Sequence, residues 1–132
     1  MSRRMRRTSR GTGAAAIKGA IAGAVATWLM PSYGAAAEKV AGLAGRSLDD
    51  HQRERVGVAI HWAIGIGTGA LYAVLRRRFA GVGKLGGAAF GAAFWGVVDE
   101  GLVSGAQARG LAGHLTFGTV TDATLRVLDA VA

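Results

Sequence analysis

Two histidines and two acidic residues are the side chains of this chain best suited to chemistry. His61 and His114 each stand near the start of an apolar segment, and Asp99 and Glu100 follow another such segment. Histidine changes its charge near neutral pH, so a histidine beside a carboxylate forms a group that responds to acid. The sequence therefore predicts a proton-responsive polar cluster of His61, His114, Asp99 and Glu100.

The same four residues allow two other interpretations. Each histidine could hydrogen-bond to a carboxylate or a backbone carbonyl and simply fix the register of its helix. Two histidines and a carboxylate can also bind a divalent metal ion, but no HxH or HxxxH spacing supports a metal site. We expect no catalytic residue, metal or cofactor, because the chain lacks cysteine, a phosphate-binding loop and a nucleophile elbow.

A second charged pair lies later in the chain. Asp122 and Arg126 are four residues apart, which places both side chains on one face of a helix. The spacing predicts an ion pair inside the membrane, where an unpaired charge is costly. A proton-relay role for the Asp122 carboxylate is the alternative.

Four apolar segments must position these side chains. Half of the residues are apolar, and 22 of the 132 are glycine, so a water-soluble core of large side chains would be hard to build. A helix of about 20 residues is roughly 30 Å long and matches the hydrocarbon core of a bilayer. The sequence predicts one all-α membrane domain over 14–132, with four transmembrane helices at about 14–30, 56–75, 80–98 and 111–131.

Basic residues indicate the orientation of these helices. Five arginines fall in 1–13, which we expect to be a disordered tail, and Arg76–Arg78 follow the second apolar segment. An excess of arginine on the cytoplasmic side predicts that both termini are cytoplasmic. The net charge of +8 is explained if these arginines contact anionic lipid headgroups. We therefore expect no nucleic-acid partner. The alternative is that 1–13 and the first apolar segment form a cleaved secretory signal.

An internal repeat relates the second and fourth segments. Residues 57–75 align with 110–128 without gaps, and eight of the nineteen positions are identical, His61 with His114 among them. This pattern predicts two tandem helical hairpins with the same orientation, related by an axis along the membrane normal. A coincidence of composition is the alternative interpretation.

Glycine spacing predicts the faces on which the helices pack. Small residues three or four positions apart let membrane helices approach closely. His61, Gly65, Thr68 and Tyr72 share such a face, and we expect Phe90 to point towards lipid instead. The predicted packing glycines are Gly19, Gly23, Gly65, Gly69, Gly87, Gly91 and Gly118.

Four stretches of the chain resemble the YagU-like family of small bacterial inner-membrane proteins. They are "IKGAIAGAVATWLMP", "HWAIGIGTGALYAVL", "GAAFGAAFWGVVDEGLV" and "GHLTFGTVTDATLRVLD". The resemblance implies a multi-pass inner-membrane protein without assigned chemistry and with a link to acid tolerance. It adds no cofactor and no catalytic residue.

Together these patterns predict a small inner-membrane protein that is not an enzyme. We expect it to be linked to acid or envelope stress through the His/carboxylate cluster, with the bilayer as its main partner. Its Gly-rich faces are also compatible with a homo-oligomer. One alternative is a subunit of a small oligomeric transporter or channel, and another is a soluble Ala/Gly-rich helical assembly protein.

Overall fold

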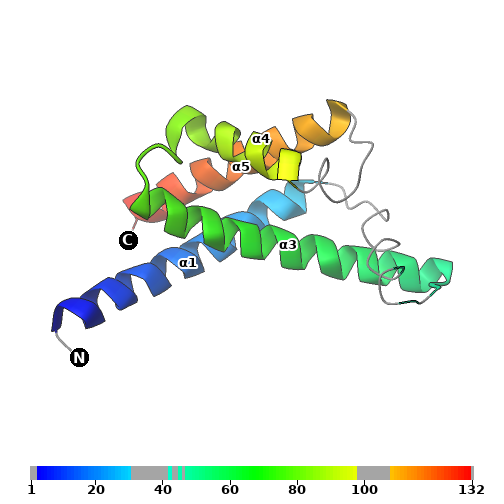
Figure 1. The fold of residues 1–132 in the computed structure, drawn as a ribbon, viewed down its shortest axis with the longest axis horizontal. Coiled ribbons are helices and arrows are strands. Elements are labelled where there is room, and N and C mark those ends of the chain that lie inside the picture. The colour runs from blue at the N-terminus through cyan, green and yellow to red at the C-terminus, as the bar shows by residue number, and fades with distance from the viewer. Residues whose placement is uncertain (1–2, 31–41, 43–44, 46, 98–107, 132) are drawn as a thin grey trace.

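The computed structural model describes residues 3–30, 42, 45, 47–97 and 108–131. Every regular element in these residues is helical, which confirms the all-α prediction for the described part of the chain (Figure 1). The elements are α1 (Arg3–Leu29), α3 (Asp50–Arg78), the short 3-10 helix η1 (Lys84–Gly87), α4 (Ala88–Trp95) and α5 (Ala108–Ala130).

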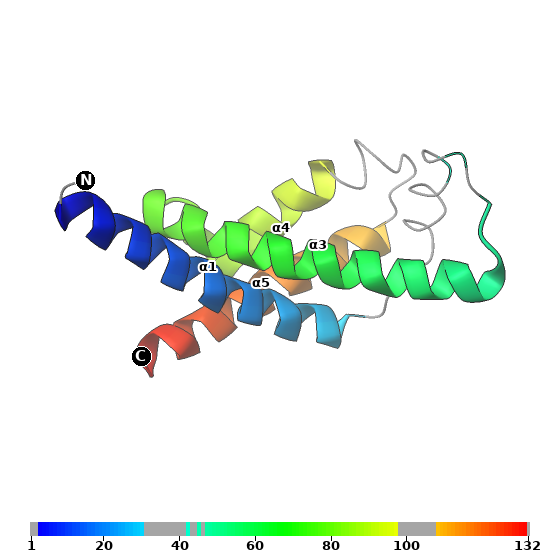
Figure 2. The same cartoon turned by 90° about the horizontal axis from the view of Figure 1, so that it is seen from below.

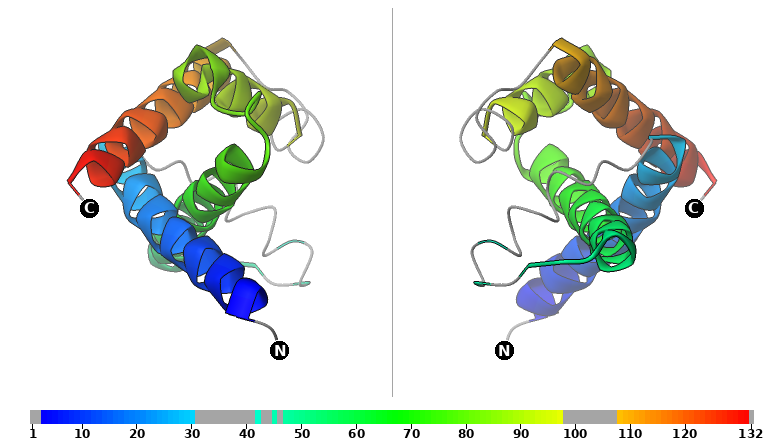
Figure 3. Two further views of the ribbon diagram at one scale, coloured as in Figure 1. Left: turned by 90° about the vertical axis from the view of Figure 1, so that its left-hand side faces the viewer. Right: turned by 90° about the vertical axis from the view of Figure 1, so that its right-hand side faces the viewer.

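The four α-helices form an open bundle. Viewed along its length, they lie at the corners of a rough square, with α1 between α3 and α5 and with α4 beside α5 (Figure 3). The two long helices α1 and α3 cross each other near the middle of the molecule (Figure 2). The start of α1, the end of α3 and the end of α5 lie at the same end of the bundle, which we call the arginine end after Arg76–Arg78.

Helix α3 is longer than the predicted span 56–75 because polar residues extend it at both ends. Asp49 caps its start: the Asp49 carboxylate accepts the Gln52 backbone N–H at 2.8 Å, and the Gln52 side chain accepts the Asp49 N–H at 3.3 Å. Its last turn consists of Arg76–Arg78, whose charges interact favourably with the negative end of the helix dipole.

Helix α1 begins at Arg3, so it includes most of the segment that we expected to be disordered. Arginine is a good helix former, and extending an existing helix costs far less than starting one. A tertiary contact also anchors this extension, because Arg77 Nη1 donates to the Gly11 carbonyl at 2.6 Å. The boundary predicted at residue 14 marked where the chain becomes apolar, and the helix continues past it.

The predicted continuous helix over 80–98 differs most from the structure. Three consecutive residues, Leu85, Gly86 and Gly87, have φ angles of 57°, 58° and 80°, and this left-handed break precedes α4. Glycine adopts such angles at little cost, and Leu85, the one non-glycine, is 80 % exposed. The eight residues of α4 cover about 12 Å, less than half of a bilayer core.

Two of the described helices are long and apolar enough to cross a membrane. They are Gly11–Leu29 within α1 and Asp50–Arg78, the whole of α3. Helix α5 is long enough to cross a membrane, but it carries four charged residues, Arg109, Asp122, Arg126 and Asp129. Four full spans therefore stay a prediction.

The interior of the bundle consists mainly of small and polar residues, together with Tyr72, Phe117 and Leu125, and most large aliphatic side chains of α1 and α3 lie outside. The buried non-glycine residues include Ala15, Ala22, Ala26, Thr27, Thr68, Tyr72, Thr121 and Asp122. On α1 and α3, the exposed large apolar side chains are Ile17, Ile21, Val25, Trp28, Leu29, Val58, Ile64, Ile66 and Leu71. A helix of a water-soluble domain typically does the reverse and buries its large apolar side chains.

One aromatic residue lies on a different face from the one we expected. The Phe90 ring packs on the Tyr72 ring, with the two centroids 4.8 Å apart, and Phe90 is partly buried against the core. The left-handed break at the start of α4 sets the direction of this helix, which an uninterrupted helix would not have had. The expectation that Phe90 faces lipid was therefore wrong.

Candidate functional site

The crossing of α1 and α3 depends on four of the predicted packing glycines. A methyl group added at Gly19 would collide with the Gly69 carbonyl, and one added at Gly23 would collide with the Gly65 carbonyl. In the opposite direction, a methyl group at Gly65 would meet the Thr27 side chain. The two backbones are in direct contact at two successive levels, which any larger residue would prevent.

The crossing of α4 and α5 depends on the other three predicted packing glycines, Gly87, Gly91 and Gly118. A methyl group at Gly87 would collide with the Gly118 carbonyl, one at Gly118 with the Gly87 carbonyl, and one at Gly91 with the His114 carbonyl. Gly65 and Gly118 occupy equivalent positions of the sequence repeat, so the same carbonyl meets a glycine in both halves.

The two histidines contact different groups. His61 Nε2 lies 3.3 Å from the Thr27 carbonyl oxygen, in the last turn of α1. The His114 ring meets the edge of Phe94, with ring centroids 5.5 Å apart. Asp99 and Glu100 lie outside the described residues, so the predicted cluster of four stays a prediction.

Asp122 is the centre of a buried charged network at the arginine end. Its residue is 1 % exposed, although aspartate is rarely buried without partners. The predicted partner Arg126 donates from Nε at 2.7 Å. Arg76 Nη1 donates at 2.9 Å and the Tyr72 hydroxyl at 2.8 Å, both from α3. The carboxylate therefore joins α5 to α3 through two hydrogen bonds, and the third is within α5.

Asp129, two turns further along α5, extends the network to α1. Its carboxylate accepts from Arg76 Nη2 at 2.8 Å and from Lys18 Nζ at 3.0 Å. Lys18 Nζ also donates to the Leu128 carbonyl at 3.0 Å. Arg76 bridges both carboxylates of α5, so a single guanidinium links them.

The network explains how α5 can carry charges in an apolar bundle. Lys18, Arg76 and Arg126 supply three positive charges, and Asp122 and Asp129 supply two negative charges. Opposite charges in direct contact offset part of the cost of removing them from water, provided that their hydrogen bonds are satisfied. The carboxylates face cations on neighbouring helices, so these contacts set how α5 is rotated about its axis.

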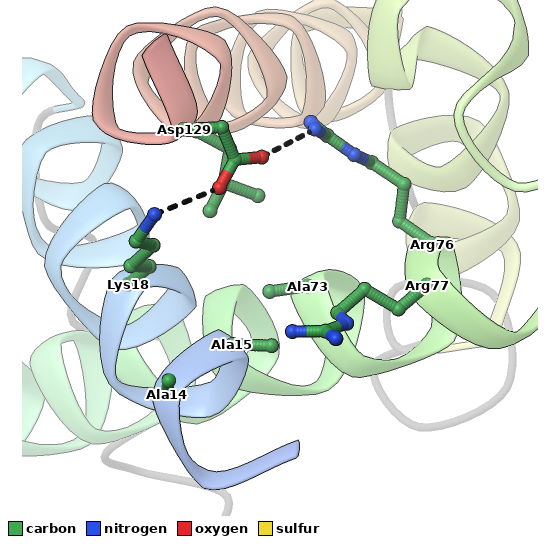
Figure 4. Close-up of a pocket in the computed structure, with 8 residues that line it drawn as sticks. Ala14, Ala15, Lys18, Ala73, Arg76, Arg77 and Asp129 are labelled. Carbon is green, nitrogen blue, oxygen red and sulfur yellow. Dashed lines mark hydrogen bonds and ion pairs between the residues drawn. The ribbon is translucent and has the colours of Figure 1, made fainter. Parts of the chain in front are cut away.

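A small cavity of about 80 Å³ adjoins the network, between α1, α3 and α5 (Figure 4). Its polar wall consists of Lys18, Arg76, Arg77 and Asp129, and its apolar wall of Ala14, Ala15, Ala73 and Leu125. Figure 4 shows the Arg77 side chain passing beside Ala15 at this cavity. Among the described residues, no three metal-ligating side chains are close enough to hold a metal ion.

Sequence reasoning missed four members of this site: Lys18, Tyr72, Arg76 and Asp129. A signal was present for two of them, because continuing the face of His61, Gly65, Thr68 and Tyr72 by one turn reaches Arg76. Arg76 and Asp129 also lie at the same offset of 53 residues, one position beyond the aligned segments 57–75 and 110–128. The pairing of Lys18 with Asp129 had no such signal, since it depends on α1 lying beside α5.

The chain was also compared with known proteins. No protein-family model, curated protein or solved structure matches it. The resemblance to the YagU-like family therefore stays a prediction that depends on the four quoted stretches.

Proposed function

We propose that this protein is a multi-pass protein of the bacterial inner membrane whose bundle is solvated by lipid. The observation that supports this most strongly is that α1 and α3 expose large apolar side chains and bury small and polar ones. Large side chains such as Ile17 and Trp28 are 65 % and 73 % exposed, whereas Thr27 and Thr68 are buried. In water this arrangement would lose hydrophobic stabilisation, but in lipid it places apolar side chains in apolar solvent.

Both termini lie on the cytoplasmic side in this proposal. The arginine end gathers Arg76–Arg78 with the start of α1, and basic residues near membrane helices favour the cytoplasm. Trp28 then lies near the opposite face, at the level where an interfacial tryptophan is favourable. In this proposal helix α5 also crosses the membrane, with its carboxylates paired.

The role that we propose is a non-catalytic response to acid outside the cell. His61 Nε2 lies 3.3 Å from the Thr27 carbonyl oxygen, in the last turn of α1. This oxygen also accepts the Met30 backbone N–H at 3.1 Å, and its two lone pairs allow it to accept from both groups. A protonated imidazole always donates from this nitrogen, and its charge interacts favourably with the negative end of the helix dipole. Acid would then tighten the contact between α1 and α3 on the outer side.

Alkaline carbonate extraction of cell membranes tests the location. The account expects the full chain to stay in the pellet and its C-terminus, fused to a reporter, to be active in the cytoplasm. Release into the supernatant would contradict it and favour the soluble assembly protein. For the acid response, His61→Ala should abolish any difference in helix contact between neutral and acidic medium, and His51→Ala, on the exposed first turn of α3, is the matched control.

The buried carboxylate favours one other function, a subunit of a small transporter or channel. Ionisable residues inside membrane bundles often mark the path of an ion, and Asp122 is such a residue. Flux of protons or small ions into liposomes containing the purified chain, lost in Asp122→Asn, would support this function. The proposed structural role expects no flux above that of empty liposomes.

A further inference from the structure

We infer that the cavity between α1, α3 and α5 binds the phosphate group of an anionic phospholipid. The inference depends on the proposed membrane location, and it assigns a ligand class to the cavity that the network borders. Its ligand is a phosphate ester, held at the arginine end by Arg77 with help from Lys18.

The charges around the cavity do not cancel. Three cations, Lys18, Arg76 and Arg77, line it together with one carboxylate, Asp129. Lys18 and Arg76 both contact that carboxylate, whereas Arg77 Nη1 donates to the neutral carbonyl of Gly11. The cavity therefore keeps excess positive charge, and it is concentrated on the Arg77 guanidinium. A guanidinium has five N–H donors, so Arg77 can keep its carbonyl contact and still bind phosphate with two others.

The depth of the cavity suits a lipid headgroup. Ala14 and Lys18 lie in the first turns of the apolar part of α1, and Ala73 and Arg77 lie in the last turns of α3. With cytoplasmic termini, this level is the inner headgroup region, where anionic lipids attract basic residues. The volume of about 80 Å³ is suited to a phosphate group and not to a whole lipid.

The surface beside the cavity can accommodate the acyl chains. Ile17 and Ile21 are exposed on α1 and lie one and two turns deeper in the membrane than Ala14. A lipid whose phosphate contacts Arg77 could therefore lay its chains along this aliphatic face. Inorganic phosphate has no acyl chains and would gain no affinity from Ile17 and Ile21. Tighter binding of a phospholipid than of inorganic phosphate therefore distinguishes the two ligands.

Thermal unfolding of the purified full chain in detergent, with added lipid, tests the site. Ligand that binds the folded state raises the unfolding midpoint. Phosphatidylglycerol should raise the midpoint by several degrees, and phosphatidylcholine should not. Arg77→Gln should weaken the phosphatidylglycerol effect at least fivefold. Arg78→Gln is the matched control: it removes the same charge from the next residue, which does not line the cavity.

A second variant keeps the test decisive if Arg77→Gln is poorly folded. Ala14→Leu fills the mouth of the cavity without changing charge, and it should also abolish the lipid effect. Equal losses in Arg77→Gln and Arg78→Gln would overturn the site, because they would show attraction by net charge alone. A midpoint shift with inorganic phosphate as large as that with phosphatidylglycerol would overturn the lipid assignment. Carbonate extraction reports separately on the membrane location itself.

Discussion

The two helix crossings of this bundle use the same contact but are stabilised differently. At Gly65 and at its equivalent Gly118, a backbone carbonyl meets a glycine of the preceding helix. One turn later the halves diverge, because Gly69 again touches backbone whereas its equivalent Asp122 carries a buried charge. Close backbone contact at two levels forms each crossing, but only the second crossing includes a helix, α5, that a charged network also joins to α3 and α1. The two aligned segments therefore share the place of backbone contact and differ in the interaction one turn later.

The largest effect should come from Asp122→Ala. The substitution leaves Arg76 and Tyr72 without their shared acceptor, and breaking a buried ion pair costs about 3–5 kcal/mol of unfolding free energy. Chemical unfolding in mixed micelles measures it. Asp50→Ala is the control, because the Asp50 side chain is 95 % exposed and its pair with Arg53 is worth roughly 0–1 kcal/mol. Equal losses in both variants would mean that the network does not stabilise the packing of α5 in the bundle.

Gly69→Val should be next, because it tests the first crossing. The added side chain would collide with the Gly19 carbonyl and with Gly23, and overpacking of this kind costs about 3 kcal/mol or more where backbone cannot move. Gly67→Val is the matched control, since a methyl group at Gly67 meets nothing within 4 Å. The same unfolding assay measures the stability of both variants. Similar unfolding midpoints would refute the close contact of α1 and α3 at Gly69.

Tyr72→Phe should have a smaller effect. It removes one hydrogen bond to a carboxylate that keeps both arginine partners, which is worth about 1.5 kcal/mol. The Phe90 ring contact should survive, because both aromatic rings remain. A loss as large as that of Asp122→Ala would show that the hydroxyl, and not the arginine pairing, holds the network together.

Asp129→Asn should have the smallest effect. The Asp129 side chain is half exposed, so its pairs with Lys18 and Arg76 are screened by solvent and worth about 0.5–1 kcal/mol. The loss should shrink further in high salt, whereas the loss in Asp122→Ala should change little. Equal salt dependence in the two variants would mean that Asp122 is not buried.

Much of the fold follows from patterns that the sequence carries locally. The length of an apolar run predicts α1 and α3, and spacing by three or four residues predicts that Gly65 and Gly118 face a neighbouring helix. The pair of Asp122 with Arg126 follows from the same spacing, because both residues lie on one helix. Such features depend on neighbours within a turn or two.

The rest depends on contacts between distant segments. Gly86 and Gly87 tolerate a left-handed break, but other glycines, such as Gly65 and Gly69, lie within regular helix, so composition alone does not place the break. The pairing of Lys18 with Asp129 follows from the packing of α1 on α5, and Arg76 reaches both carboxylates from a third helix, α3. These interactions arise from tertiary packing and not from any local propensity.

Spin-label accessibility tests most directly whether lipid covers the outer faces of α1 and α3. The chain has no cysteine, so Ile21→Cys and Ile64→Cys each give a single attachment site at an exposed position. In liposomes, the account predicts that nitroxides at both positions collide more often with dissolved oxygen, which concentrates in lipid, than with a water-soluble nickel complex. Preferential collision with the nickel complex at either position would place that face in water and contradict the account.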